Sequence, residues 1–125
     1  MLKTLLASSA LVVGIATAAS AQDAAAGEKV FAKCKACHVI DAATNRVGPS
    51  LHGIIGRTAG TVEGFKYSDA MTQHGKDGLV WNNENLDKYL ADPKTFVPKN
   101  KMAFAGLKSA DDRANVIAYI DEASK

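Results

Sequence analysis

The stretch Cys34-Lys35-Ala36-Cys37-His38 decides how the rest of this 125-residue sequence is interpreted. Two cysteines separated by two residues and followed at once by histidine form the attachment pattern for a c-type haem. Thiols three residues apart lie on one face of a helical turn, where both can form thioethers with the vinyl groups of the porphyrin. The imidazole that follows then lies under the iron, for which histidine is a common axial ligand. We therefore expect Cys34 and Cys37 to hold a haem covalently and His38 to bind its iron.

The same residues allow two other interpretations. A Cys-x-x-Cys pair can be a redox-active dithiol or half of a zinc site. A zinc site needs two more ligands at compatible spacing, and the sequence contains only these two cysteines. A thioredoxin-like dithiol is expected within an alternating strand–helix pattern, which the sequence lacks. The haem interpretation is therefore favoured.

The first 21 residues have the features of a secretion signal. Lys3 gives a positive start, an apolar run follows over 5–18, and Ala19-Ser20-Ala21 fits the small-x-small cleavage pattern. The alternative is an uncleaved membrane anchor, but the apolar run is shorter than the roughly 20 residues that a spanning helix needs. We expect residues 1–21 to be a cleavable signal peptide, cut after Ala21, and residues 22–125 to form one domain exported to the periplasm.

Length and charge are consistent with a small exported domain. Without its first 21 residues the 125-residue chain keeps 104, which is enough for one domain with a modest core. The formal net charge of +2 falls to +1 when Lys3 is removed. A nearly neutral domain gives no support for nucleic-acid binding, so no nucleic-acid partner is expected.

Helical periodicity and capping residues predict an all-α domain of short helices. The expected elements are a helix over 24–36 capped by Asp23, one over 68–74 capped by Ser68, one over 83–91 capped by Asn83, a short turn over 93–97 and a last helix capped by Ser109. The segments 39–64 and 98–106 show no periodic pattern and are expected to be long loops that wrap something. Gly27 costs a helix about 1 kcal/mol relative to alanine, and a second helix that crosses closely at this point would explain it.

An iron bound by His38 alone has an open sixth position. The candidate ligands after residue 21 are His52, His74, Met71 and Met102. Met102 ranks first because it lies in the irregular loop 98–106 and because a Met/His pair is a known haem ligation. Met71 fits a core position on a short helix, His52 fits a hydrogen bond between loops, and His74 fits the surface.

With these residues in place, the sequence resembles the class I cytochromes c, the small soluble bacterial and mitochondrial-type cytochromes. The resemblance covers essentially all of residues 22–125. It rests on the haem motif together with 27–31 (GEKVF), 48–53 (GPSLHG), 64–70 (GFKYSDA), 89–93 (YLADP), 101–106 (KMAFAG) and 116–119 (VIAY). It implies the cytochrome c fold: about five short helices, long loops wrapped around one covalently bound haem, and crossing N- and C-terminal helices.

The resemblance also implies roles for individual residues. His38 and Met102 are the axial ligands, and the Pro49 carbonyl accepts the Nδ1 proton of His38, which fixes the ring. Tyr89 directs its hydroxyl at the Met102 sulfur. The residues that contact the propionates are Arg57, Tyr67, Trp81 and, where mitochondrial proteins have threonine, Asn100. Met71 occupies a position where a polar asparagine is often found.

The function that this resemblance implies is electron transfer by a monomer with one haem c, and not enzymatic catalysis. The electron passes between respiratory or photosynthetic membrane complexes, with a bc-type quinol–cytochrome c oxidoreductase as donor. A cytochrome c oxidase, a reaction centre or another periplasmic reductase is the acceptor. Lysines near the haem edge are expected to steer docking: Lys33, Lys35, Lys94, Lys99, Lys101 and Lys108.

Two other functions remain open at this point. A peroxidase-like enzyme would need an open sixth position on the iron, whereas the sequence offers Met102. A dedicated subunit of one dehydrogenase or reductase would show a large exposed apolar patch, and the sequence has no obvious additional apolar segment.

Overall fold

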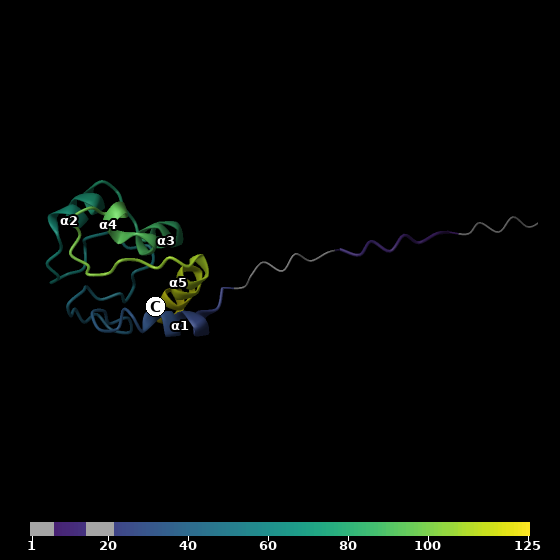
Figure 1. Ribbon diagram of the computed structural model, residues 1–125, viewed down its shortest axis with the longest axis horizontal. Coiled ribbons are helices and arrows are strands. Elements are labelled where there is room, and N and C mark those ends of the chain that lie inside the picture. The colour runs from purple at the N-terminus through teal and green to yellow at the C-terminus, as the bar shows by residue number, and fades with distance from the viewer. Residues whose placement is uncertain (1–6, 15–21) are drawn as a thin grey trace, which may run out of the picture.

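The computed structural model describes residues 7–14 and 22–125, and within these ranges the secondary structure is helical. The helices are α1 (Ala24–Phe31), α2 (Asp69–Lys76), α3 (Asn83–Ala91), α4 (Pro93–Phe96) and α5 (Ala110–Ala123). The described ranges contain no strand, only an isolated antiparallel bridge between Thr58 and Val80. Short helices joined by long loops, as Figure 1 shows, confirm the predicted all-α class.

The expected signal peptide falls largely outside the described residues, which omit 1–6 and 15–21. Its middle part, 7–14, forms neither helix nor strand, and Leu11, Val12 and Val13 are exposed there. Among the described helices, none has the length and apolar character that crossing a membrane requires.

Side-chain caps set where the helices begin. The caps predicted for α1, α2 and α5 are confirmed: Asp23 accepts from the Ala26 amide, Ser68 from that of Met71, and Ser109 from that of Asp112. The cap predicted for α3 is wrong by one residue. Asn82 has the extended backbone of a cap and accepts from the Asn85 amide at 2.8 Å, whereas Asn83 is already helical. Either asparagine can cap a helix, so the sequence could not distinguish them.

The first helix is shorter than predicted. It ends at Phe31 rather than Ala36, because the amides of Ala32, Lys33 and Cys34 bond to carbonyls three residues earlier, at 2.8–3.3 Å. This bonding tightens the chain into turns. The amides of Cys37 and His38 then both bond to the Cys34 carbonyl, at 3.1 and 2.9 Å. The Cys-x-x-Cys-His motif therefore lies on compact turns that directly follow α1.

The first and last helices cross in close contact, as predicted. They are the most extensively contacting pair of helices, and Figure 1 shows α1 lying against α5. A methyl group added to Gly27 would overlap the backbone carbonyl of Asn115, so the two backbones approach too closely for any side chain. Phe31 is 1% exposed, and its ring lies 5.2 Å from that of Tyr119. The cost of Gly27 in the helix is therefore offset by the close approach that it permits.

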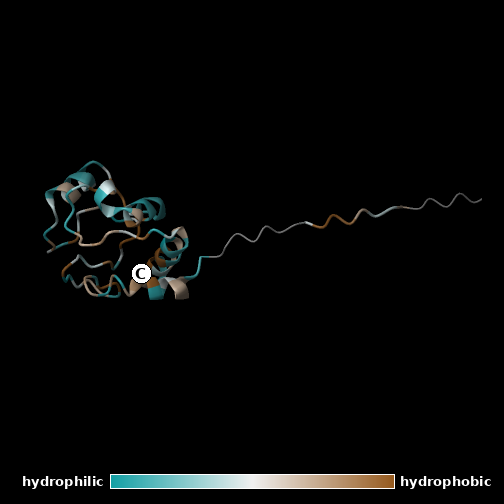
Figure 2. Ribbon diagram, in the orientation of Figure 1, coloured by the Kyte–Doolittle hydropathy of each residue, from teal (hydrophilic) through white to brown (hydrophobic). Residues whose placement is uncertain are grey.

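The apolar core extends from this crossing into the loops. It joins residues of α1, α3 and α5 to loop residues, among them Ile40, Ile54, Trp81, Val97 and Leu107. In Figure 2 brown, hydrophobic segments gather at the crossing of α1 and α5 and within the globular part. The long loops are thus part of the core and carry side chains to a shared interior.

Candidate functional site

A single cavity brings together all ten residues that the sequence analysis assigned to the haem site. Its volume is about 250 Å³, near the lower end of ligand pockets. The residues of the predicted site that line it are Cys34, Cys37, His38, Pro49, Arg57, Tyr67, Trp81, Tyr89, Asn100 and Met102. They come from seven separate segments of the chain. The rest of the lining is mainly apolar and includes Leu51, Ile54, Phe65, Leu86 and Phe104.

The four candidates for the sixth iron ligand separate into two groups. Met102 and Met71 line the cavity, whereas His52 and His74 do not. Met71 is 8% exposed and belongs to the core cluster, and Met102 is only partly buried and packs against that cluster. The geometry thus leaves two sulfur candidates.

His38 has a fixed ring and a fixed tautomer. Its Nδ1 donates to the Pro49 carbonyl at 2.8 Å, which leaves Nε2 with a free lone pair. Burial lowers the pKa of His38, and the hydrogen bond to Pro49 opposes this in part. The ring also lies so close to Gly48 that a methyl group there would overlap it. A neutral imidazole held in this way is the form that binds a metal ion.

Pro49 is itself held by its neighbours. The next residue, Ser50, is 2% exposed, and its amide donates to the Asn45 side chain at 2.9 Å. The Ser50 hydroxyl donates to the Ala42 carbonyl at 2.6 Å. The Asn45 amide group donates in turn to the Glu63 carbonyl at 3.0 Å and so joins two loops. These bonds hold the loop that carries Pro49, and they thereby fix the position of the carbonyl that orients the His38 ring.

The electrostatics of Cys34 disfavour the dithiol interpretation. Burial and the neighbouring Cys37 raise the pKa of the Cys34 thiol, against a smaller opposing effect of Lys33. Reactive dithiols depend on a lowered thiol pKa, so this pair lacks the feature that thiol exchange needs. Within 7–14 and 22–125, moreover, no three His, Cys, Asp or Glu side chains gather as a metal site would require.

Met102 is accompanied by an aromatic hydroxyl. The Tyr89 hydroxyl lies 3.9 Å from the Met102 sulfur, and the Tyr89 ring packs 4.9 Å from that of Trp81. Burial raises the pKa of Tyr89 to about 12. The hydroxyl therefore keeps its proton at neutral pH and can donate it toward sulfur, a weak acceptor.

One part of the cavity wall carries a positive charge and hydrogen-bond donors. Arg57 is half-buried and donates to the carbonyls of Ser50, at 2.9 Å, and His52. Burial lowers the pKa of Arg57, and no carboxylate in the described part of the chain forms an ion pair with it. The Tyr67 hydroxyl accepts from the Val62 amide at 3.0 Å, which leaves its own proton free to donate. A partly buried cation with a free donor beside it suits a carboxylate ligand, as a haem propionate would be.

The Asn100 side chain is directed at the protein backbone. Its Nδ2 donates to the carbonyls of Pro93 and Val97, both at 2.9 Å, and its Oδ1 accepts from the Met102 amide at 2.8 Å. Both amide hydrogens are thus used within the chain. The propionate contact implied for Asn100 stays a prediction, and this geometry gives it no free donor.

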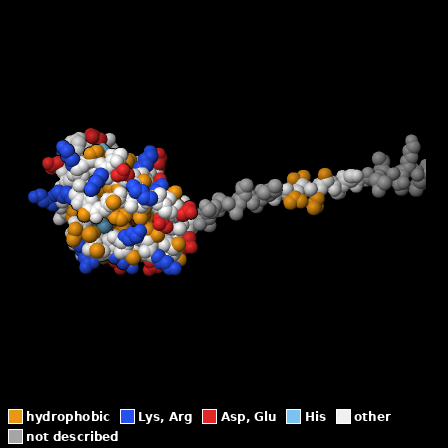
Figure 3. Space-filling view, in the orientation of Figure 1, with side chains coloured by type: hydrophobic (Ala, Val, Ile, Leu, Met, Phe, Trp, Pro, Cys, Tyr) orange, Lys and Arg blue, Asp and Glu red, His pale blue; other side chains and the backbone are white. Residues whose placement is uncertain are grey.

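Two of the six predicted docking lysines border the cavity. Lys33 and Lys101 line it, and Lys101 also donates to the Tyr67 carbonyl at 3.4 Å. Lys35 borders a different hollow. Hydrogen bonds from Thr95 lower the pKa of Asp92, and the nearby Lys108 adds a smaller effect in the same direction. Figure 3 shows basic side chains beside an area of hydrophobic side chains on the face in view.

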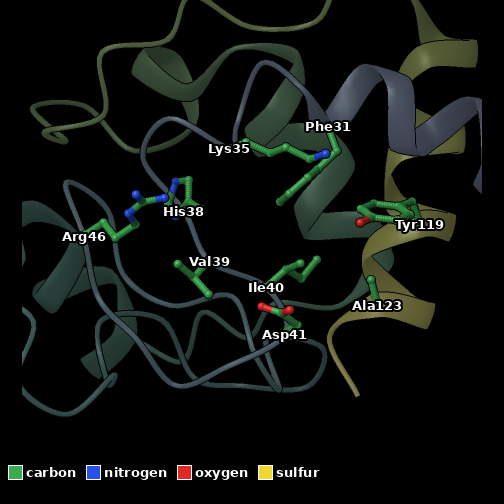
Figure 4. Close-up of a pocket in the computed structure, with 9 residues that line it drawn as sticks. All are labelled: Phe31, Lys35, His38, Val39, Ile40, Asp41, Arg46, Tyr119 and Ala123. Carbon is green, nitrogen blue, oxygen red and sulfur yellow. The ribbon is translucent and has the colours of Figure 1, made fainter.

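A second hollow, of about 380 Å³, is chemically less suited to a cofactor. Figure 4 shows it between the end of α1, the segment 38–41 and α5. Lys35 and Arg46 border it together with Asp41 and Tyr119. Its charges have both signs, and neither cysteine nor methionine lines it. The first cavity, which is lined by both thiols and by the sulfur ligand candidates, is therefore the candidate site.

Sequence reasoning missed three residues that position the site. Gly48 gives the His38 ring its space, and Asn45 and Ser50 fix the loop that carries Pro49. The Gly-Pro pair at 48–49 signals a turn, but no local pattern shows which ring lies against the glycine. The role of Asn45 depends on Glu63, 18 positions away, and has no sequence signal of its own.

Comparison with known proteins agrees with this site. The family model for cytochrome c matches residues 24–124. Cytochrome c2 iso-2 of Magnetospirillum molischianum is 57% identical over 98 residues, which cover 78% of this chain and 95% of that protein. The structure of ferricytochrome c2 from Rhodopseudomonas palustris matches with a TM-score of 0.75 at 41% identity, covering 81% of this chain and 98% of that one. Cytochrome cH from Methylobacterium extorquens gives a TM-score of 0.73 at 46% identity, covering 80% and 98%.

The matched region contains every residue of the cavity. Proteins of this family are electron carriers and not enzymes, and they hold one haem c through two cysteines. The neutral imidazole, the two thiols, the methionine sulfur and the cationic wall of the cavity all suit that group. The chain therefore belongs to the cytochrome c family and is a mono-haem electron carrier.

Proposed function

We propose that this protein shuttles single electrons between membrane redox complexes in the periplasm, with His38 and Met102 as the axial ligands of its haem iron. The observation that carries the proposal is the shared cavity of these two residues. In it His38 is neutral and oriented by Pro49, and the Met102 sulfur lies beside the Tyr89 hydroxyl. Cys34 and Cys37 are the covalent attachment points in this proposal.

The bound haem supplies one-electron exchange between Fe(II) and Fe(III). The chain contributes the surroundings of that exchange. His38 and Met102 would hold the iron from its two axial sides, and methionine ligation would favour a high reduction potential. The apolar lining would keep water from the haem, while Arg57, Tyr67 and Trp81 would bind a propionate whose charge would otherwise be costly to bury.

Filled axial positions favour a carrier over a peroxidase-like enzyme, which needs an open site for peroxide. The dedicated-subunit alternative would require a broad exposed apolar surface. Within 7–14 and 22–125 the only large hydrophobic residue exposed outside the 11–13 segment is Val47, which borders the cavity. A single such residue is small for a permanent interface and suits brief contacts.

The partners and location complete the proposal. Residues 1–21 are a signal peptide removed after Ala21, and residues 22–125 are the mature soluble monomer. The donor is a bc-type quinol–cytochrome c oxidoreductase, and the acceptor is a cytochrome c oxidase, a reaction centre or another periplasmic reductase. Relatives named as cytochromes c2 occur in bacteria such as Magnetospirillum molischianum and Afifella marina, which supports a bacterial carrier of this kind.

Expression of the full chain with a haem-attachment system tests this proposal. We expect a coloured periplasmic protein whose mass equals residues 22–125 plus one haem, with the haem retained in acid–acetone. The oxidised protein should show the charge-transfer absorption of a methionine–iron bond, and the reduced protein should not bind carbon monoxide promptly at neutral pH. A removable haem would contradict the covalent site, and prompt carbon monoxide binding would favour the enzyme.

A substitution of Lys33 tests docking without removing a side-chain hydrogen bond or ion pair found in the described part of the chain. Lys33→Gln should slow electron transfer with an anionic partner about two- to threefold at low salt, because one charge of the attractive field is lost. The difference should vanish at high salt, where surface charges are screened. Stopped-flow rates at several ionic strengths provide the measurement.

Lys76→Gln is the matched control for Lys33→Gln. Lys76 is exposed at the end of α2 and does not line the cavity. Lys101 is a poor choice for this test, because its ammonium group also bonds to the Tyr67 carbonyl. Equal rates and equal salt dependence for both variants and the parent protein would remove Lys33 from the docking surface.

A further inference from the structure

We infer that Asn100 is a positioning residue that holds Met102 in place for the iron, rather than a residue that touches a haem propionate. This inference rests on the proposed ligation by Met102. The Asn100 side chain makes three hydrogen bonds to backbone groups, and one of them is with the amide of Met102 itself.

The base of this arrangement is the one-turn helix α4. Pro93 is buried and Val97 is 0% exposed, so both ends of α4 are fixed in the core. Asp92 caps its N-terminal end through hydrogen bonds with the amide and hydroxyl of Thr95, at 3.2 and 2.7 Å. The carbonyls of Pro93, the first residue of α4, and of Val97, which follows its last residue, accept the two hydrogen bonds from Asn100 Nδ2. Asn100 is therefore attached to a rigid element.

The loop that Asn100 supports has almost no other polar anchor. Between residues 101 and 106, the Met102 amide is the only backbone group that forms a hydrogen bond within the part of the chain that the structure describes, and its acceptor is Asn100 Oδ1. The next backbone anchor is the Leu107 amide, which donates to the Leu90 carbonyl at 2.7 Å. Without Asn100, the segment that presents the sulfur would be held by packing, by the Lys101 side chain and by the weak Tyr89 contact.

The backbone before Asn100 is unfavourable without such support. Lys99 has φ of 66°, the only described non-glycine residue with a positive φ. A side chain in this region costs about 1–2 kcal/mol. Contacts of the neighbouring residues must therefore hold Lys99 in this conformation. Asn100, the next residue, supplies such contacts through its side-chain hydrogen bonds. The amide of Asn100 thus links a strained turn, a rigid helix and the sulfur-bearing residue.

Asn100→Ala in the haem-loaded protein tests this inference with imidazole as the probe. Three hydrogen bonds of ordinary net strength correspond to a change on the order of 100-fold in an equilibrium constant. We therefore expect the oxidised variant to bind imidazole at the iron on the order of 100-fold more tightly than the parent protein. The Met102 amide should also lose its protection against hydrogen exchange, a readout independent of electron transfer.

Thr95→Ala is the matched control, because it removes the hydrogen bond between the Thr95 hydroxyl and Asp92 in α4 without touching an Asn100 contact. Its imidazole affinity should remain within a few-fold of the parent value. Asn100→Asp guards against a misfolded alanine variant. It keeps an acceptor for the Met102 amide but loses both donors, so its affinity should fall between those of the parent and the alanine variant.

Three outcomes would overturn the inference. They are parental imidazole affinity in both Asn100 variants, an equal effect from Thr95→Ala, and a shifted reduction potential with unchanged imidazole affinity and Met102 protection. The last would show a propionate contact. A parent protein without the methionine–iron absorption band would instead overturn the proposed ligation. Failure of the two ideas is therefore distinguishable.

Discussion

Alanine in place of Met102 should lower the midpoint reduction potential by on the order of 100 mV or more, because axial ligands move haem potentials over a range of about 0.8 V and methionine favours the high end. The reduced variant should also bind carbon monoxide promptly, since its sixth position is open to small ligands. Redox titration followed by absorbance, and carbon monoxide mixing, measure the two effects. The variant would then have an open sixth position on its iron, as a peroxidase-like enzyme requires.

Met71→Leu is the control for Met102→Ala, because Met71 is the other sulfur in the cavity lining. Leucine nearly conserves the volume of this buried side chain, and such exchanges usually cost less than about 1.5 kcal/mol. We expect the potential and the methionine–iron absorption band to be almost unchanged. If Met71→Leu abolished the band and Met102→Ala left it intact, Met71 would be the ligand.

Gly27→Ala should destabilise the folded protein by about 3 kcal/mol or more, although alanine is the better helix former. Helix propensity alone predicts a gain of about 1 kcal/mol. The added methyl would overlap the Asn115 carbonyl and lie 3.0 Å from the Tyr119 Cβ, so α1 and α5 would have to separate. Overpacking typically costs about 1–3 kcal/mol, and backbone atoms can yield less than side chains. Denaturant unfolding of the haem-loaded protein gives the free energy.

The sign of the change makes this test decisive. Ala25→Gly alters one methyl group at an exposed position of the same helix, and it should cost no more than about 1 kcal/mol. A more stable Gly27→Ala variant would show that the two backbones do not meet at this glycine. Loss of the haem-loaded protein on expression of this variant alone would agree with the expected direction.

The sequence predicts this fold well where the signals are local. The caps Asp23, Ser68 and Ser109 each precede a periodic segment, and the structure confirms them. The prediction that α1 continues to Ala36 is wrong because 32–36 contains good helix formers, and propensity gives no sign that the bonding tightens at Phe31. Local preference is only a weak guide where turns and tertiary contacts decide the backbone.

The candidate site shows a similar division. The haem-attachment motif can be recognised from the sequence, because both thiols and the imidazole lie within five consecutive residues. Arg57, Tyr67 and Trp81 are distant in sequence, and only the family resemblance indicated them. The orientation of the Asn100 amide could not be predicted, because it depends on how the loop 98–106 returns to α4. Side-chain partners across loops are set by the assembled structure.

The crossing of α1 and α5 also determines the order in which the molecule can assemble. The Asp23 amide bonds to the Asn115 side chain, 92 positions later, at 2.9 Å. A chain that is exported unfolded with its N-terminus leading therefore keeps α1 without its partner until almost the last residue has crossed the membrane. During that interval the thiols of Cys34 and Cys37 remain accessible to the attachment machinery. Late pairing of the chain ends thus gives the porphyrin time to be joined before the protein closes around it.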